Sequence, residues 1–291
     1  MSLWGIYNPI FTFSILPFSV NKPDKKFMAM FTGFMDGDGY FDIGEQKQYN
    51  KITKALVKST IRIRLATNVN IRDLSLLEYF VQILGVGKIS NMSGDREQVR
   101  VIFSKKDLVT VIMPLIKEYN LPFLTSQRVK QFALANYILE NNITQWDNVK
   151  FMESKFTSIP VHDLVKLDFF RDWLIGFTMA EGSFGMKSQG SAFYQLKQKG
   201  EDNLYLLEAA FLIITGKEAK SMKADSVDAY QISLSSKIDT EKVISFFSSP
   251  DHHPLYGYKL SQFTLWLYSL KNSKRYGQIK GILFENINSN E

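Results

Sequence analysis

The sequence predicts an α+β protein built of two pseudo-symmetric halves, each with the element order α-β-β-α-β-β-α and an antiparallel sheet. Three observations support this prediction. An apolar helical run that ends in an acid and a glycine occurs twice, within residues 27–49 and 169–189, and the segments after each run recur in the same order. The 291 residues are 45% hydrophobic and 14% aromatic, a composition typical of globular chains.

Each expected element follows from its local pattern. Apolar residues recur at helical spacing in the helices and alternate with polar residues in the strands. After the first run we expect strands and helices at 40–43, 58–70, 71–84, 86–92, 97–103, 105–118 and 126–141. After the second run we expect their counterparts at 183–186, 191–199, 201–215, 217–224, 228–234, 239–247 and 259–271. Polar turns at 93–95 and 224–226 are expected to join the later strand pairs.

The repeat divides the chain into an apolar N-terminal arm, a first half, a polar linker, a second half and a tail, at 1–26, 27–142, 143–167, 168–282 and 283–291. Residues 2–20 of the arm contain two prolines and an asparagine but no Lys or Arg, which is inconsistent with a signal peptide or a membrane helix. No later stretch reaches about 18 apolar residues without a charge. We therefore expect no membrane partner.

Small residues predict how the two repeated helices pack. Gly33 and Gly37 are four residues apart, as are Gly176 and Ala180, so each pair lies on one helix face. Small residues at this spacing allow two helix backbones to approach closely. We therefore expect a central seam of two helices between the halves.

The ends of these two helices carry the candidate chemistry. Gly39 and Gly182 are expected to end the helices in the left-handed conformation, which places Asp38 and Glu181 together at the end of the seam. The helix dipole disfavours a carboxylate at a helix C-terminus. An acid at both positions therefore predicts a divalent cation between them. Asp36 is interpreted instead as a polar contact near the seam, because its counterpart in the repeat is not an acid.

Composition restricts the kind of metal site. The chain has no cysteine and only three histidines, which excludes disulfides, a thiol nucleophile and cysteine- or histidine-based metal centres. A metal must therefore be held mainly by oxygen, as Mg²⁺, Ca²⁺ and Mn²⁺ are. The net charge of +6 is too small to identify a nucleic-acid partner by itself.

At this point the two motifs resemble a known family. Residues 31–39 and 174–182 are similar to the paired signatures of single-chain LAGLIDADG homing endonucleases, and the similarity extends over residues 27–282, in the style of intron-encoded enzymes of fungal mitochondria. The resemblance implies saddle-shaped sheets, a monomer, a mitochondrial location and a role in intron mobility. It also implies Mg²⁺-dependent double-strand cleavage of double-stranded DNA with short 3′ overhangs. Mn²⁺ would substitute for Mg²⁺, and Ca²⁺ would support binding without cleavage.

The resemblance also implies roles for particular residues. It places metal contacts at both motif acids and at the residues before them, namely Asp38, Glu181, Gly37 and Ala180. The family's basic residue in the late helical segment maps onto Lys259, and Arg128 is its expected equivalent in the first half. These two residues would stabilise charge and orient the attacking water, while bulk water takes the proton.

Local charge predicts the DNA-binding surface. Residues 47–64 contain six basic residues and no acid, and residues 183–200 contain three and no acid. Strand alternation selects the side chains that face away from the core, and Arg, Lys, Gln and Asn there suit base edges and phosphates. The expected DNA contacts are Tyr40, Asp42, Gly44, Gln46, Lys47, Lys58, Arg62, Arg64, Ala66, Asn68, Ser183, Gly185, Lys187, Gln189, Gln195, Lys197 and Lys199. One helical turn of DNA per half gives a target of about 20 bp.

Two alternatives stay open. The first is a maturase that assists splicing of intron RNA, alone or in addition to cleavage. It would use a second basic surface near the C-terminus, at Lys271, Lys274, Arg275 and Lys280. The second is a DNA-binding regulator without catalysis, which would bind its target and give no Mg²⁺-dependent product.

Overall fold

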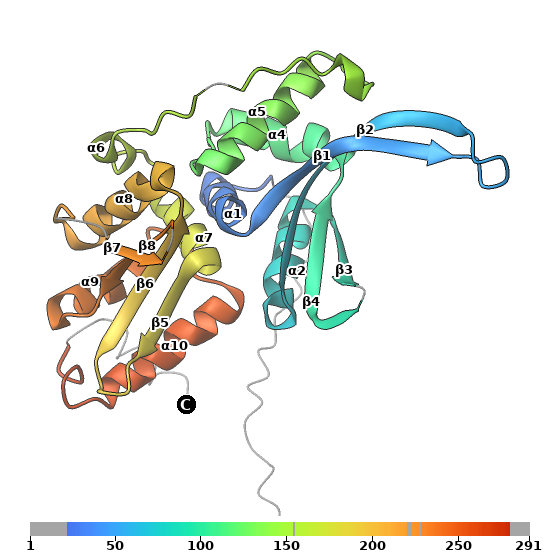
Figure 1. The fold of residues 1–291 in the computed structure, drawn as a ribbon. Coiled ribbons are helices and arrows are strands. Elements are labelled where there is room, and N and C mark those ends of the chain that lie inside the picture. The colour runs from blue at the N-terminus through green and yellow to red at the C-terminus, as the bar shows by residue number, and fades with distance from the viewer. Residues whose placement is uncertain (1–21, 93, 154, 220–222, 227, 280–291) are drawn as a thin grey trace, which may run out of the picture.

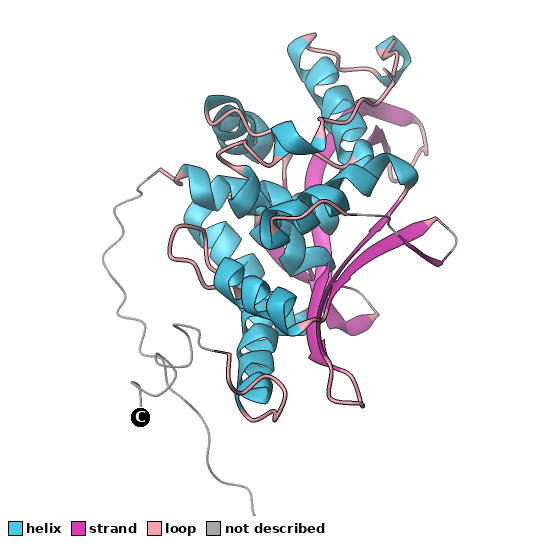
Figure 2. Ribbon diagram, turned by 90° about the vertical axis from the view of Figure 1, so that its left-hand side faces the viewer, coloured by secondary structure: helices cyan, strands magenta, loops and turns pink. Residues whose placement is uncertain are grey.

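A computed structural model describes residues 22–279 apart from 93, 154, 220–222 and 227. Most of the expected arm and the whole expected tail therefore lie outside the described residues. The molecule contains two halves that each carry one sheet (Figure 1). Helices gather on one side of the molecule and strands on the other (Figure 2), so each half has a helical layer packed on a sheet.

The first half follows the expected order. Asp24 starts its first helix by accepting a hydrogen bond from the Phe27 N–H at 2.7 Å. The expected helix at 105–118 consists of three consecutive pieces, of which the middle one is a π-helix. The bounds are α1 (Lys25–Gly37), β1 (Gly39–Tyr49), β2 (Leu56–Asn70), η1 (Ile71–Asp73), α2 (Leu74–Leu84), β3 (Lys88–Met92), β4 (Asp95–Phe103), α3 (Lys105–Asp107), η2 (Leu108–Ile112), α4 (Met113–Glu118) and α5 (Ser126–Glu140).

The second half repeats this order after a connection that crosses between the halves along the upper edge of Figure 1. That connection contains η3 (Trp146–Asn148) and α6 (Val161–Leu164). The remaining bounds are α7 (Phe170–Glu181), β5 (Gly182–Met186), β6 (Ala192–Lys199), η4 (Glu201–Asn203), α8 (Leu204–Thr215), β7 (Lys223–Ser226), β8 (Ala229–Leu234), α9 (Lys237–Phe247) and α10 (Gly257–Lys271).

One expected strand was placed wrongly. The strand expected at 217–224 does not include residues 217–219, and β7 covers Lys223–Ser226, while 220–222 lie outside the described residues. The turn expected at 224–226 lies later, because Ser226 already pairs with Ala229. The reason is the end of α8, where Gly216 has a left-handed φ of +69° and Lys217 N–H donates to Thr215 Oγ1. This helix cap uses residues that alternation alone assigns to a strand.

The two sheets have the same topology. Their strand orders are β1-β2-β4-β3 and β5-β6-β8-β7, and all neighbours are antiparallel. Each sheet buries one face under its own helices, where Phe80 and Phe103 lie in the first half and Tyr194 and Leu206 in the second. The α+β class, the two similar halves and the antiparallel sheets are as the sequence predicts.

The predicted seam is present between α1 and α7, which cross at their glycines. A Cβ added to Gly33 would lie 1.9 Å from the Trp173 carbonyl oxygen, and one added to Gly176 would lie 1.8 Å from the Met30 carbonyl oxygen. These distances are far below van der Waals contact, so backbone meets backbone where each glycine lies. The halves are therefore joined through a contact that no larger residue permits.

The conformation expected for Gly39 and Gly182 was wrong. Neither has a positive φ, and Gly182 is extended with φ −89° and ψ 162°. Glycine is needed for space instead. A Cβ on Gly39 would lie 2.6 Å from the Met35 carbonyl oxygen, and one on Gly182 would lie 2.7 Å from the Thr178 carbonyl oxygen. The chain thus turns from helix into strand directly against the last helical turn. Within the part of the chain that the structure describes, no helix is long and apolar enough to cross a membrane.

Candidate active site at the end of the helix seam

Asp38 and Glu181 lie at the same end of the seam, each where its helix passes into the first strand of a sheet. The missing side chain of Gly37 makes room for the second acid. A Cβ at Gly37 would lie 3.1 Å from Glu181 Cγ, 3.7 Å from Glu181 Oε1 and 2.4 Å from the Ala180 Cβ. The seam residues therefore also determine how closely the two acids approach.

Asp38 is exposed and Glu181 is half-buried, but the protein around both carboxyl groups excludes part of their water. This loss of water raises the pKa of Asp38 to about 6 and that of Glu181 to about 7. The nearby Asp73 carboxylate raises the pKa of Asp38 further, and Asp38 does the same to Glu181. Lys259 and Arg128 oppose these shifts at both acids. Two carboxylates and two cations thus form one electrostatic cluster that spans both halves.

Arg128 joins this cluster from the first turns of α5. Its side chain is buried, with Nε donating to the Met35 carbonyl oxygen at 3.2 Å and Nη1 donating to Gln131 Oε1 at 2.9 Å. Gln131 Oε1 also accepts from the Phe41 N–H at 3.1 Å. Burial lowers the pKa of the Arg128 guanidinium, and the charges of Asp36, Glu181 and Asp38 raise it again.

Lys259 occupies the matching place on α10. Its Nζ donates to the Gly182 carbonyl oxygen at 2.5 Å. Gln262, three residues later, accepts from the Phe184 N–H at 3.5 Å, just as Gln131 accepts from Phe41. Burial lowers the pKa of Lys259, and the charges of Asp73, Asp38 and Glu181 counter this effect. The shared spacing places Arg128 and Lys259 at equivalent positions of the two halves.

The two glutamines were not identified from the sequence. The signal was present, because Arg128 and Lys259 each have Gln at the third position after them and Phe at the fourth. That short pattern occurs in helices whose apolar periodicity is weak, so it is visible only once the two basic residues are aligned.

Asp36 is a structural residue, as its sequence interpretation proposed. It is buried and accepts hydrogen bonds from the N–H groups of Leu124 and Thr125, from the Thr125 hydroxyl and from Trp173 Nε1, all at 2.7–2.9 Å. Burial raises its pKa to about 6, and these hydrogen bonds oppose the shift. Because its oxygens are occupied, Asp36 is not available as a metal ligand.

The donor set fits a hard divalent cation that is completed by substrate. Among the described residues no group of three or more His, Asp or Glu side chains could hold a metal ion, so Asp38 and Glu181 stay the two predicted carboxylate ligands. Mg²⁺ is commonly held by one or two carboxylates, with water and substrate phosphates as its other ligands. The carbonyl groups of Gly37 and Ala180, one residue before each acid, stay predicted contacts.

The predicted DNA-facing residues of the first half lie along the outer face of β1 and β2. The register pairs Asp42 with Arg64 and Gly44 with Arg62, so these positions share one face. In the free protein Asp42 and Arg62 form two contacts of 2.8 Å, and Arg100 Nε donates to Asn68 Oδ1 at 2.6 Å. Arg100, on β4, extends this face beyond the two strands that the sequence prediction covered.

Two predicted DNA contacts in this half are placed differently. Ala66 is only 2% exposed, because it lies between Tyr40 on β1 and Ile102 on β4, whose strands cover it on both sides. It is therefore not free to contact DNA. Lys47 pairs with Glu45 at 3.0 Å and lies opposite Ser59, on the other face from Gln46. Gln46 and Lys58 are exposed near the hairpin tip.

The second half places Ser183, Gln195 and Lys197 on one face of β5 and β6. Gly185 also lies there, but the ring of Phe193 covers it, at 2.6 Å from where a Cβ would be. The sequence prediction omitted Phe193, although its alternation with buried Ala192 and Tyr194 could have revealed it. Lys187 and Gln189 lie in the exposed hairpin turn, and Lys199 ends β6.

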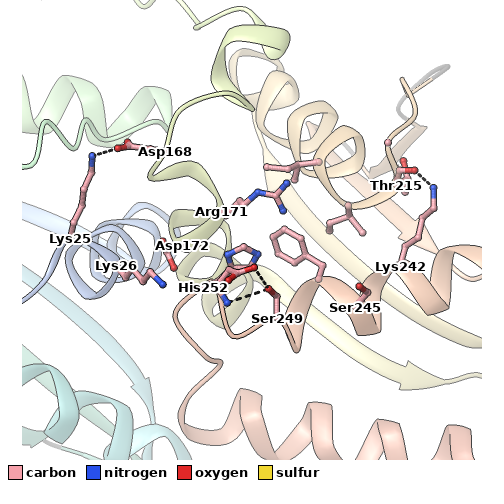
Figure 3. Close-up of a pocket in the computed structure, with 15 residues that line it drawn as sticks. Lys25, Lys26, Asp168, Arg171, Asp172, Thr215, Lys242, Ser245, Ser249 and His252 are labelled. Atoms are coloured by element: carbon pink, nitrogen blue, oxygen red, sulfur yellow. Dashed lines mark hydrogen bonds and ion pairs between the residues drawn. The ribbon is translucent and has the colours of Figure 1, made fainter. Parts of the chain in front are cut away.

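Two pockets clarify where the chemistry lies. A recess of about 450 Å³ beside Glu181 is lined by Gly37, Arg128, Lys199 and Asn203. A larger pocket of about 950 Å³ lies at the opposite ends of α1 and α7 (Figure 3). Its charges are largely engaged within the protein, with Lys25 paired to Asp168 and Lys242 bound to the Thr215 carbonyl oxygen. Size alone therefore does not identify the site.

No histidine belongs to the cluster of acids and cations. His162 pairs with Glu218, His253 bonds to the Tyr79 hydroxyl at 3.0 Å, and His252 lines the larger pocket. The site therefore contains carboxylates, cations and amides but no imidazole that could act as a general base.

Comparison with known proteins matches the first half of the chain to a family model and most of the chain to named relatives. The family model described as LAGLIDADG endonuclease matches residues 31–138. The "probable intron-encoded endonuclease Cox1-I1b" of Schizosaccharomyces pombe is 27% identical, over 90% of this chain and 69% of its own. The "probable intron-encoded endonuclease aI3" of Dictyostelium discoideum is 22% identical, over 78% of this chain and 90% of its own.

Solved structures share the fold. The meganuclease I-SmaMI bound to uncleaveable DNA matches with a TM-score of 0.65 and 18% identity, over 91% of this chain and 97% of that one. The meganuclease I-AabMI bound to uncleaved DNA matches with a TM-score of 0.61 and 22% identity, over 89% of this chain and 96% of that one. The likeness therefore covers both halves.

Proposed function

We propose that the chain is a LAGLIDADG endonuclease, which makes a metal-dependent double-strand break in a long, pseudo-symmetric DNA target and leaves short 3′ overhangs. One observation carries this proposal. The acids of the two motifs, Asp38 and Glu181, meet at the end of the seam, and each half contributes one buried or partly buried cation to them. A duplicated arrangement of acid and cation suits a reaction that takes place once on each strand.

Each group in the cluster has a defined task. Asp38 and Glu181, when deprotonated, would hold a divalent cation. When bound, this cation would supply Lewis-acid chemistry, by lowering the pKa of a water and neutralising phosphate charge. Arg128 and Lys259 stabilise the negative charge that develops on the phosphate oxygens. Without a nearby imidazole, bulk water takes the proton.

Mg²⁺ is the proposed metal, with Mn²⁺ able to substitute and Ca²⁺ supporting binding without cleavage. The two-carboxylate donor set supports an oxygen-bound cation of this kind. A relative, I-SmaMI, has been solved bound to its uncleaved DNA target in the presence of calcium ions.

The outer faces of the two sheets would read the DNA in adjacent major grooves. Arg64, Gln46 and Gln195 can contact base edges, while Lys58 and Lys197 suit phosphates. At one helical turn per half, the target is about 20 bp long. The protein would act as a monomer, because both halves of the site belong to one chain.

The wider role we propose is intron mobility from a mitochondrial location. Support comes from the relatives named as intron-encoded endonucleases in Schizosaccharomyces pombe and Dictyostelium discoideum. Intron RNA is a second candidate partner. The observation favouring it is the exposure of Lys274 and Arg275 just after α10. Lys280 lies outside the described residues. An intron-splicing assay with the double variant K274A/R275A tests this role separately from cleavage.

Cleavage selection from a randomised duplex library with Mg²⁺ tests the main proposal. We expect one family of sequences of about 20 bp, cut on both strands with a 3′ stagger. Tight binding to a selected duplex without any Mg²⁺-dependent product would contradict the proposal and favour a DNA-binding regulator. A matched selection with Ca²⁺ in place of Mg²⁺ should enrich bound but uncut duplexes.

A further inference from the structure

Two short turns, each directly after a strand of the predicted DNA-binding surface, contact helices of the opposite half. The turn η1 follows β2 and ends at Asp73, and η4 follows β6 and ends at Asn203. These residues occupy equivalent places, since each precedes the first leucine of the next helix. Their side chains do not serve their own half alone. Each also reaches the start of the late helix of the other half.

Asp73 holds the start of α10. Its Oδ1 accepts from the Tyr258 N–H at 3.2 Å, one residue before Lys259. Gly257 has a left-handed φ of +61°, and a Cβ there would lie 3.3 Å from Asp73 Oδ1 and 3.1 Å from Leu76 Cβ. The Arg72 guanidinium lies over the Tyr258 ring at 3.9 Å. The first half thus fixes the helical turn that carries the basic residue of the second.

Asn203 holds the start of α5 in the same way. Its Oδ1 accepts from the Ser126 N–H at 2.9 Å, two residues before Arg128. Its Nδ2 donates to the Lys199 carbonyl oxygen at 2.8 Å, which ties it to the end of β6. Tyr205 donates its hydroxyl to the Leu124 carbonyl oxygen at 2.5 Å. The second half thus fixes the turn that carries the basic residue of the first.

We propose that Asp73 and Asn203 are positioning residues that form a crossed latch, in which each half sets the catalytic cation of the other. This inference depends on the proposed function, because the cations must act in cleavage. Each latch residue lies within four residues of the end of a strand that faces the DNA. Binding of one half to its part of the target would therefore affect the cation that the other half supplies.

The latch is not symmetric in charge. Asp73 is a carboxylate beside Lys259, whereas Asn203 is neutral beside Arg128. The Asp73 charge favours the protonated form of Lys259 in addition to holding its helix. We therefore expect replacement of Asp73 by Asn to have a small effect on the step that depends on Lys259, whereas Asn203 contributes through its hydrogen bonds alone.

Strand-resolved cleavage tests the latch. A duplex carrying the selected target is labelled differently on its two strands and cut with Mg²⁺ under single-turnover conditions. The variants K259A and R128A first identify the strand that depends on each cation. We expect D73A to slow only the strand that depends on Lys259, about tenfold, and N203A to slow only the other strand by a similar factor.

D73N keeps the acceptor oxygen and removes the charge. We expect it to restore the strand that depends on Lys259 to within about threefold of wild type, with DNA affinity changed by less than about threefold. It also keeps the test decisive if D73A folds poorly, as judged by its circular dichroism.

Three outcomes would overturn the latch. The first is that D73A and N203A each slow both strands equally. The second is that K259A and R128A each slow both strands equally, and the third is that D73N slows both strands alike. If the wild-type protein cuts neither strand of any duplex, the proposed function itself is wrong, which is a different result.

Discussion

The two halves agree at the seam and differ at the outer ends of their sheets. At the seam, Gly33 corresponds to Gly176 and Asp38 to Glu181. A Cβ added to either glycine would lie less than 2 Å from a backbone oxygen of the opposite helix. At the outer ends, β1 has 11 residues and β5 has 5, and the first hairpin projects well beyond the body of the molecule (Figure 1). Chemistry on two equivalent strands requires a symmetric centre, whereas reading a sequence does not require symmetric arms.

A second difference lies just under the seam. Asp36 holds the segment before α5 through three hydrogen bonds, whereas its counterpart Met179 receives one contact from the Tyr256 N–H, to its sulfur at 3.2 Å. Both residues therefore fix the segment that leads to one of the two predicted catalytic residues, Arg128 or Lys259. The first half does so with a buried carboxylate and the second with a soft thioether, supplemented by Asp172, which accepts from the His253 N–H.

The largest effect is expected at the seam. In Gly176→Ala the new methyl group would meet the Met30 carbonyl oxygen at 1.8 Å, so the two helices must separate. We expect a loss of about 4 kcal/mol or more in the free energy of unfolding, or no folded protein. Gly44→Ala is the control, because its methyl group meets only Arg62 Nη2 at 3.9 Å, and it should change stability by less than about 0.5 kcal/mol. Denaturant unfolding measures both, and a stable Gly176→Ala protein would show that the seam is not tight.

Substitutions at Asp36 and Met179 should also lower the free energy of unfolding by unequal amounts. Asp36→Ala leaves several buried donors unpaired, among them Trp173 Nε1, and should cost about 3–5 kcal/mol. Met179→Leu keeps the volume and should cost less than about 1.5 kcal/mol. Thermal unfolding followed by circular dichroism compares them. Equal losses for the two variants would contradict the difference described above.

The unequal hairpins predict an unequal footprint on DNA. At about 3.3 Å per residue, the six extra residues of β1 extend the first hairpin by roughly 20 Å, which is about 6 bp. Its tip carries exposed Lys51 and Lys54 and the 90% exposed Ile52. Hydroxyl-radical footprinting with Ca²⁺ should therefore show protection that extends farther from the cleavage site on one side.

A shortened hairpin sharpens this test. In this variant Asn-Gly replaces residues 49–57 and joins Gln48 to Lys58, which keeps the pairing of these two residues. The change should remove about 3 bp of protection on that side alone. The variant K51A/K54A keeps the length of the hairpin, so the boundary of the protected DNA should not move. The slope of log affinity against log salt concentration should fall by the equivalent of about two phosphate contacts. A footprint with equal arms in the wild-type protein would be inconsistent with the unequal hairpins acting as DNA-reading arms.

A smaller effect is expected from pH. The folded-state pKa values of Asp38 and Glu181, about 6 and about 7, lie above their ordinary values. A raised folded pKa contributes stability that is present below about pH 4 and lost as pH rises through the folded pKa. Without metal, the free energy of unfolding should therefore decline between about pH 4 and 7, and less so in D38N/E181Q. An equal decline in both proteins would contradict the assignment of these pKa values.

The same pKa values predict weaker metal binding in acid. If Asp38 and Glu181 are the proposed ligands, a cation that binds them has to displace their protons, so its affinity in the DNA complex should fall as pH drops below about 7. Calorimetry in two buffers with different ionisation enthalpies should detect proton release at pH 6 and little at pH 8. Equal release at both pH values would contradict this prediction.

The sequence predicted the features that depend on local pattern. The repeat of small residues predicted the seam, and the acid before each terminal glycine predicted where Asp38 and Glu181 lie. The conformation of Gly39 was wrong because its constraint is the carbonyl group of Met35, a three-dimensional contact that composition does not reveal. Ala66 was wrong because alternation gives the face of a strand but not the width of the sheet beside it.

The contacts that Asp73 and Asn203 make across the halves could not be predicted from the sequence. Asp73 and Tyr258 are 185 residues apart, and Asn203 and Ser126 are 77 apart. Neither pair belongs to a motif, and a side chain that caps a distant helix carries no periodic signal. The glutamines that follow Arg128 and Lys259 were visible in principle, but only after the structure had aligned α5 with α10.

The most direct test of the central claim compares cleavage with binding in D38N and E181Q. On the selected duplex with Mg²⁺, we expect each variant to lose at least about a thousandfold in double-strand cleavage while its affinity with Ca²⁺ changes by less than about threefold. D163N, at an exposed acid that pairs with Lys166, should cut at the wild-type rate. Cleavage at the wild-type rate by either seam variant would show that the paired acids are not the catalytic centre.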